Sequence, residues 1–120
     1  MYIDKNAITN ELAISNAAVL HKATGEQRYL ELALSQWSWF KSSGMINHKT
    51  GAICDGLNID PRTYVCSGSG GTSYTYNQGV ILGGLAHLYG QTKDQSLLDS
   101  AHVIANGTSS RTFSIRPLPR

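Results

Sequence analysis

The chain has 120 residues, of which 41% are hydrophobic and 15% are charged, and its net charge is +2. This length suits one small domain with a modest core. The lysines and arginines are scattered, which argues against a nucleic-acid partner and against a basic helix on a membrane surface. The longest apolar run, residues 80–86, is too short to cross a bilayer, so we expect no transmembrane segment.

The first two predicted helices form a hairpin over residues 5–43. The first helix spans residues 5–22, and its expected buried face consists of Ile8, Leu12, Ser15, Ala18 and Val19. The second helix spans residues 27–43, and its apolar stripe consists of Leu30, Ala33, Leu34, Trp37 and Phe40. Thr24 and Gln27 have the spacing of a capping box, and Gly44 is a natural helix end.

A loop over residues 44–75 separates this hairpin from the second one. It is rich in Gly, Ser, Asn and Thr, and a loop of this length is usually functional or disordered. Within it, residues 45–47 and 52–54 are short extended pieces that could pair weakly. Cys54 and Cys66 also lie there, and a disulfide between them would contribute about 3 kcal/mol. Two unpaired cysteines are the alternative; a metal site is not expected, because no second Cys/His pair has ligand spacing.

The second predicted hairpin covers residues 76–106. Its first helix spans residues 76–89, and the face of its second helix consists of Leu97, Leu98, Ala101, Ile104 and Ala105. Residues 24–33 align without a gap with residues 92–101, at an offset of 68. This internal repeat predicts two copies of one unit, an inner helix, a tight turn and an outer helix.

The two ends of the chain give opposing signals about its compartment. Residues 1–5 lack the features of a secretion signal, which alone predicts a cytosolic chain. The cysteines favour an oxidising compartment, and Asn106 begins an N-glycosylation motif. We expect the domain to span residues 1–108 and the basic tail, residues 109–120, to be disordered. The tail and Met1 fit the ends of a partial reading frame.

Polar side chains begin two of the predicted helices. Tyr76, Asn77 and Gln78 could line a sugar-binding cleft, the Tyr stacking on a ring and the amides bonding hydroxyls. Capping of the helix is the alternative, since Asn is a favoured N-cap. Asn10 and Glu11 occupy the matching position on the first helix. They could contact a substrate or form a buried polar network between the inner helices.

Three further features have structural and functional interpretations. Asp55 precedes a glycine, which is typical of a turn, but it could also reach over the cleft to hold a sugar hydroxyl. Trp37 is expected in the core and Trp39 against a neighbouring hairpin, although both could stack on sugars. Gly79, Gly83 and Gly84 are expected to allow close packing of inner helices. The four histidines show no ligand or triad spacing.

Five segments, in the same order, resemble glycoside hydrolase family 76, the endo-α-1,6-mannanase family. They are residues 5–12 (KNAITNEL), 37–40 (WSWF), 43–47 (SGMIN), 55–57 (DGL) and 74–85 (YTYNQGVILGGL). The resemblance implies an all-α fold, an (α/α)6 toroid of six helical hairpins, of which this chain supplies two. It also implies a secreted or surface-bound protein whose partner is a mannan-type polysaccharide, and no cofactor.

In that family, catalysis is attributed to two adjacent aspartates at the start of an earlier helix, and this chain contains no such pair. Glycosidic cleavage needs two carboxylates at a defined spacing, and Glu11 and Asp55 are the only pair that we place near one cleft. We therefore expect a ring fragment without catalytic residues, inactive alone, whose missing hairpins are its partners. A non-catalytic helical-repeat module that binds a glycan or a protein is the alternative. Another six-hairpin sugar enzyme, such as an epimerase, is a weaker one.

Overall fold

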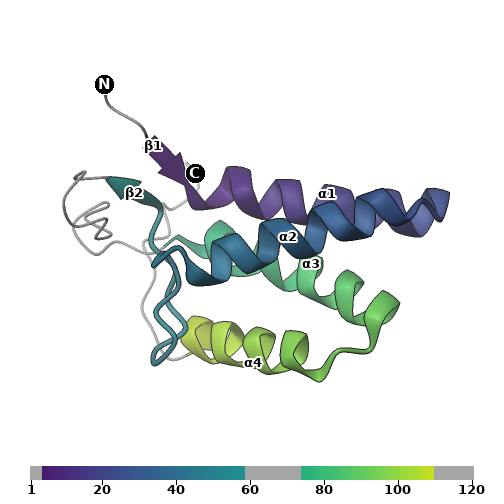
Figure 1. Ribbon diagram of the computed structural model, residues 1–120. Helices are drawn as coiled ribbons and strands as arrows, with labels where there is room; N and C mark the ends of the chain where they lie inside the picture. Colours follow the sequence, from purple (N-terminus) through teal and green to yellow (C-terminus); the bar gives the residue numbers. More distant parts are fainter. Residues whose placement is uncertain (1–3, 59–73, 110–120) are drawn as a thin grey trace, which may run out of the picture.

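The computed structural model describes residues 4–58 and 74–109, and four helices carry the fold (Figure 1). Strand β1 (Asp4–Asn6) leads into α1 (Ala7–Thr24), and α2 (Gln27–Ser42) follows. Strand β2 (Gly56–Asn58) precedes α3 (Thr75–Thr92) and α4 (Gln95–Ser109). The inner helices α1 and α3 pack on each other, α2 covers α1, and α4 covers α3. This is the predicted pair of helical hairpins; the predicted tail, apart from Ser109, lies outside the described residues.

A small sheet that the sequence analysis did not predict fixes the start of α1. Strands β1 and β2 are antiparallel, with Lys5 opposite Leu57. The predicted helix start at residue 5 is therefore wrong, because residues 4–6 are extended. Asn6 is the N-cap instead, and its Oδ1 accepts from the Thr9 N–H at 2.9 Å. The expected weak pairing in the loop is confirmed by a bridge between Ile46 and Ile53.

The internal repeat is confirmed at the turn of each hairpin. Gly25 and Lys93 both adopt the left-handed conformation, with φ of 72° and 58°, and end α1 and α3. The Gly25 N–H donates to the His21 carbonyl, and the Lys93 N–H donates to the Tyr89 carbonyl, both at 2.8 Å. All of these positions differ by the predicted offset of 68.

The threonines of the two turns are also equivalent. The Thr24 hydroxyl donates to the Leu20 carbonyl and accepts from the Glu26 N–H. The Thr92 hydroxyl has the same two kinds of partner, Leu88 and Asp94. The predicted capping box at Thr24 is nevertheless wrong. The N-cap of α2 is Glu26, which makes no side-chain capping bond, because the left-handed residue 25 places Thr24 within the last turn of α1.

The predicted apolar stripes hold for the outer helices, whereas of the predicted face of α1 only Ala18 is fully buried. Helix α2 buries Leu30, Ala33, Trp37 and Phe40, and α4 buries Leu97 and Ile104. Leu12 and Val19 of α1, which were expected inside, are each 45% exposed. Helix α1 has two neighbours, α2 and α3, and the residues that it buries against them are Ala7, Glu11, Ile14, Ala17 and Ala18. Most of these are small or polar, so hydrophobic periodicity pointed to the wrong face.

Glycine permits close approach at Gly84, where an added Cβ would lie 2.7 Å from the Ser15 Oγ on α1. Gly79 and Gly83 take no part in the α1–α3 contact, because both are exposed, and in the described part of the chain nothing beyond their own helix turn lies within 4 Å of an added Cβ. A second close contact joins the loop to α4. A Cβ at Gly107 would lie 2.6 Å from the Thr50 carbonyl oxygen, so this helix position also requires glycine.

The equivalent turn residues Gly25 and Lys93 give a matched test of backbone strain. An L-residue in the left-handed conformation costs about 1–2 kcal/mol, and a Cβ at Gly25 would meet nothing within 4 Å. Gly25→Ala should therefore lower the free energy of unfolding by about 1 kcal/mol, and Lys93→Gly should raise it by up to about 1 kcal/mol. Urea titration measures both. If the two changes shift stability in the same direction, the turns are not conformationally equivalent.

Candidate functional site

The polar ends of the two inner helices lie at the same end of the molecule. Successive contacts from Glu11 to Ile81 and from His21 to Gln91 show that α1 and α3 run parallel. Their N-termini therefore lie together, beside the β1–β2 sheet, and the two tight turns lie at the opposite end (Figure 1). The predicted substrate-binding residues are all at the end that carries the sheet, so this end is the candidate functional site.

Asp55 is the centre of this site. The Tyr76 hydroxyl and the Asn77 Nδ2 both donate to its Oδ1, each at 3.0 Å. Asp55 is held in place through its main chain as well, since its carbonyl accepts from the Ala7 N–H at 2.7 Å. The structure thus brings together Asp55, Tyr76 and Asn77, and it places Asn77 within the first turn of α3 rather than at its N-cap, which is Tyr74.

An aromatic pair lies beside this carboxylate. Tyr74 stacks on Tyr76, with ring centroids 5.3 Å apart and planes inclined by 12°. Tyr76 is 45% exposed and Tyr74 is half-buried. Burial, together with the hydrogen bond to Asp55 and its charge, raises the pKa of the Tyr76 hydroxyl. Tyr74 was missed as a site residue, although its position two residues before Tyr76 in an aromatic-rich stretch could have indicated it.

Glu11 lies beneath this surface and is completely buried. Its Oε1 accepts from the Ile81 N–H of α3 at 3.0 Å, and its Oε2 has no partner in the described part of the chain. Burial raises the pKa of Glu11 to about 9, and the bond from Ile81 opposes that shift only in part. Glu11 is therefore neutral at pH 7. It forms part of a polar contact between the inner helices, which was the second of its two predicted interpretations.

Gln78 and Asn10 hold backbone and helices in place. Gln78 is fully buried; its Oε1 accepts from the Ile53 N–H, and its Nε2 donates to two carbonyls, those of Gly51 and Ile104. Both ends of its amide are thus occupied, and it ties the loop and α4 to α3. Asn10 donates to the Asn6 carbonyl and accepts from Gln36 of α2. Neither side chain joins the Asp55 cluster.

Three other predicted positions fall elsewhere. Cys54 is disulfide-bonded, and Cys66, its predicted partner, lies outside the described residues. Asn106 is exposed near the end of α4. No group of His, Cys, Asp and Glu side chains that could hold a metal ion occurs within residues 4–58 and 74–109.

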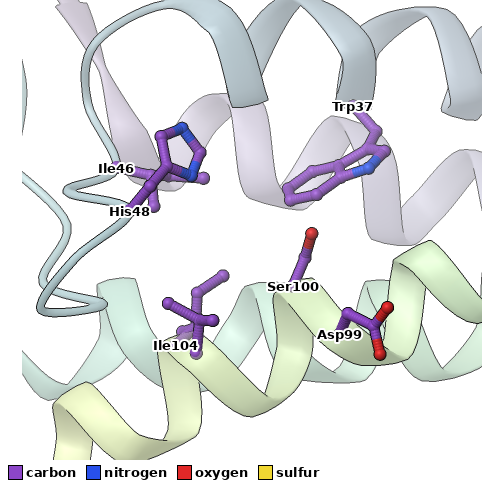
Figure 2. A pocket seen from close by; sticks show the side chains of 7 residues that line it. Trp37, Ile46, His48, Asp99, Ser100 and Ile104 are labelled. Carbon is purple, nitrogen blue, oxygen red and sulfur yellow. The ribbon is translucent and has the colours of Figure 1, made fainter.

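The structure also contains a cavity of about 180 Å³ between the outer helices. Figure 2 shows Trp37 of α2 above it, Ser100 and Ile104 of α4 below, and His48 of the loop at one side. None of the predicted site residues lines this cavity. Trp37 is 6% exposed, so it belongs to the core, as predicted, while Trp39 lies at the surface.

Comparison with known proteins identifies the family. The sequence profile of glycosyl hydrolase family 76 matches residues 1–116. The chain belongs to this family. A mannan endo-1,6-alpha-mannosidase of Saccharomyces cerevisiae is 32% identical over 114 residues, which cover 93% of this chain and 24% of that protein. This family 76 chain thus spans about a quarter of the length of that curated relative.

Solved structures agree with the family assignment. A family 76 glycoside hydrolase of Bacteroides thetaiotaomicron is 27% identical, with a TM-score of 0.75 over 87% of this chain and 22% of its own. An inactive alpha-1,6-mannanase variant of Salegentibacter sp., in complex with alpha-1,6-mannotetrose, has a TM-score of 0.79 over 94% of this chain and 32% of its own, at 22% identity. The two hairpins of the family 76 chain are hairpins of an (α/α)6 toroid. Of its described helices, none is long and apolar enough to cross a membrane.

Glu11 should make the stability of the protein depend on pH. Its folded pKa of about 9 lies above the ordinary value of 4.5, so the folded state holds the proton more tightly. The stabilisation that comes from this raised pKa is fully present below pH 4.5, and it is lost as the pH rises through about 9. Between pH 4.5 and pH 9, the free energy of unfolding should therefore fall by up to about 1.4 kcal/mol for each unit by which the pH rises. Glu11→Gln, which cannot ionise, should flatten this part of the profile in urea titrations at pH 5 to 9. Parallel profiles for the two proteins would contradict the assignment.

Proposed function

We propose that this chain is a section of a glycosidase that acts on α-1,6-linked mannan, and that the end carrying Asp55 forms part of its glycan cleft. The observation that carries the proposal is the Asp55 carboxylate, oriented by Tyr76 and Asn77 at the common end of two inner helices. Membership of family 76, and the mannan endo-1,6-alpha-mannosidase activity in the name of the yeast relative, support this substrate class.

The chemistry of this surface suits a sugar. Carboxylates accept hydrogen bonds from hydroxyls, and an exposed aromatic face packs against the C–H groups of a pyranose ring. Asp55 and Tyr76 are the members of the predicted set with exposed surface in this cluster. Asn77 acts through Asp55, and Tyr74 supports the Tyr76 ring. Glu11, Gln78 and Asn10 hold the helices and the loop in position around them.

We further propose that the chain does not cleave mannan alone. Cleavage requires an acid and a second carboxylate at a defined separation. Glu11 is buried and protonated at neutral pH, which leaves Asp55 as the one carboxyl group of the cluster that reaches the surface. The inactive Salegentibacter mannanase carries substitutions at two consecutive aspartates, and consecutive aspartates do not occur in this sequence. A non-catalytic module that binds a glycan or a protein stays the alternative.

Glycan binding by this end of the molecule can be measured directly by calorimetry with an α-1,6-linked mannotetraose, with an α-1,4-linked glucan oligomer as control. We expect binding of the mannan oligomer only, no products, and a loss of affinity of about tenfold or more in Asp55→Ala, since a bond to a charged group contributes about 1.5–3 kcal/mol. Tyr76→Phe should also weaken binding. Tyr29→Phe, at the opposite end of the bundle, is the matched control. Absence of binding would refute the cleft, and released mannose oligomers would refute the inactivity.

The unpaired faces of the inner helices support further hairpins of the same ring as partners. Glu11, Ser15 and Ala18 contact α3. Their repeat equivalents on α3 are Gly79, Gly83 and Ala86, and all three are exposed. In the other direction, Ile81, Gly84, Leu88 and Gln91 of α3 correspond to Ala13, Asn16, Leu20 and Ala23 of α1, which are also exposed. Each exposed face thus matches one side of the α1–α3 interface, so we propose that each packs against another inner helix.

Leu20 and Leu32 test this packing as a matched pair. Leu20 is 44% exposed on the proposed packing face of α1, and Leu32 is 57% exposed on the outer helix α2. In this chain, Leu20→Glu should reduce binding of the dye ANS and self-association, measured by light scattering, more than Leu32→Glu does. In a longer chain with the preceding hairpins, Leu20→Glu should cost about 2–3 kcal/mol of stability and Leu32→Glu close to nothing. Equal effects of the two changes would argue against the packing face.

We also propose that residues 1–108 form one section of the toroid and that the protein is extracellular or surface-bound. The bonded state of Cys54 supports this location, because disulfides persist in oxidising compartments. The exposure of Asn106 is compatible with glycosylation of its motif. Peptide mass mapping without reduction tests the pairing with Cys66 and the modification of Asn106 together; free thiols at both cysteines would contradict this location.

A further inference from the structure

Two buried oxygen atoms in the described part of the chain have no hydrogen-bond partner, the Oε2 of Glu11 and the Oδ1 of Asn77. Both side chains are completely buried. A buried acceptor without a donor costs about 1–3 kcal/mol, and native structures contain few of them. Two of them at one helix interface therefore need a common explanation.

The two side chains belong to the same short stretch of the α1–α3 interface. The Oε1 of Glu11 lies 3.0 Å from the Ile81 nitrogen. In an α-helix that N–H points toward the carbonyl of the residue four positions earlier, which is Asn77. The Glu11 carboxyl is therefore beside the turn of α3 that carries Asn77.

The orientation of the Asn77 amide follows from its other contact. The Asp55 carboxylate accepts only, so the Nδ2 of Asn77 must face it, as the 3.0 Å bond shows. The Oδ1 of the same amide is then turned away from Asp55 and needs a donor. An ionised Glu11 would offer only acceptors, whereas a protonated carboxyl offers one donor.

We propose that the Oε2 of Glu11 carries a proton and donates it in a hydrogen bond to the Oδ1 of Asn77, which makes Glu11 a positioning residue for Asp55. This one hydrogen bond gives both unpartnered oxygens a partner, with Glu11 as the donor and Asn77 as the acceptor. The chain of contacts runs from the Ile81 N–H through Glu11 and Asn77 to the carboxylate that Tyr76 also holds. Protonation of Glu11 thereby becomes a condition for a correctly presented Asp55.

The surroundings of Glu11 favour this protonation state. Tyr76 of α3 interacts electrostatically with Glu11, and the other titratable groups that act on Tyr76 are Asp55 from the loop and Tyr74, the N-cap of α3. Burial is the larger effect on Glu11 and raises its pKa, and the hydrogen bond from the Ile81 N–H opposes that shift only in part. From α2, Gln36 bonds to Asn10, the residue before Glu11 in the chain.

Side-chain amide NMR tests the bond without any glycan, so its outcome is separate from that of the proposed function. In the wild-type chain, the Asn77 NH₂ resonances should shift as pH rises toward 9 and Glu11 loses its proton. The NH₂ resonances of Gln78, the next residue, whose amide contacts backbone groups only, should stay in place and serve as the internal control. Asn77 resonances that do not move between pH 5 and pH 10 would overturn the proposal.

Two substitutions of Glu11 distinguish the effect of its hydrogen-bond donor from the effect of the space that its side chain fills. Glu11→Gln keeps a donor for Asn77 and an acceptor for Ile81, so its Asn77 resonances should match the wild-type positions at pH 6 and no longer shift with pH. Glu11→Met fills similar space without a donor, and its Asn77 resonances should be displaced at every pH. Displaced resonances in Glu11→Gln would show that another group satisfies Asn77. If Glu11→Met fails to fold, the wild-type and Glu11→Gln titrations decide.

Discussion

The contact between α1 and α3 is the interaction on which the rest of the structure depends. The two helices approach closely because Gly84 leaves room for Ser15, and Glu11 bonds the main chain of α3 across the interface. The outer helices then pack on this pair through their own apolar stripes and have little contact with each other. Small and polar residues thus share the α1–α3 contact with fully buried apolar side chains of the same two helices, such as Ile14 and Leu85.

This arrangement also explains where the candidate site lies. Parallel inner helices bring their N-termini to one end, and the antiparallel helix α2 returns the chain to that same end, where the connection to α3 begins (Figure 1). The connection is held at two points. Strand β2 pairs with β1, and the Gln78 side chain accepts from the Ile53 N–H and donates to the Gly51 carbonyl. Asp55 lies between these anchors and is therefore held on a rigid frame, although it belongs to a loop.

Much of the fold could be predicted from the sequence, because repeats and apolar stripes reflect local physics. The offset of 68 located both turns, and the stripes of α2 and α4 are buried as expected. The buried face of α1 could not be found in this way, because Glu11 and several alanines form it while Leu12 and Val19 stay outside. The grouping of Asp55 with Tyr76 and Asn77 could be predicted only through the family resemblance. Its geometry, and the structural role of Gln78, depend on a loop path that no local pattern encodes.

The same physics distinguishes the two carboxylates of the site. Asp55 is half-buried and receives two donors at Oδ1, so part of its carboxyl group stays open to the surface. Glu11 is deep in the interface, where desolvation keeps it neutral and where no sugar can reach it. A glycosidase needs two carboxyl groups in contact with the scissile bond, and these two side chains cannot both be in contact with it. Under the proposed function, the acid pair must therefore include at least one residue from another part of the ring, and this section would present and orient the glycan.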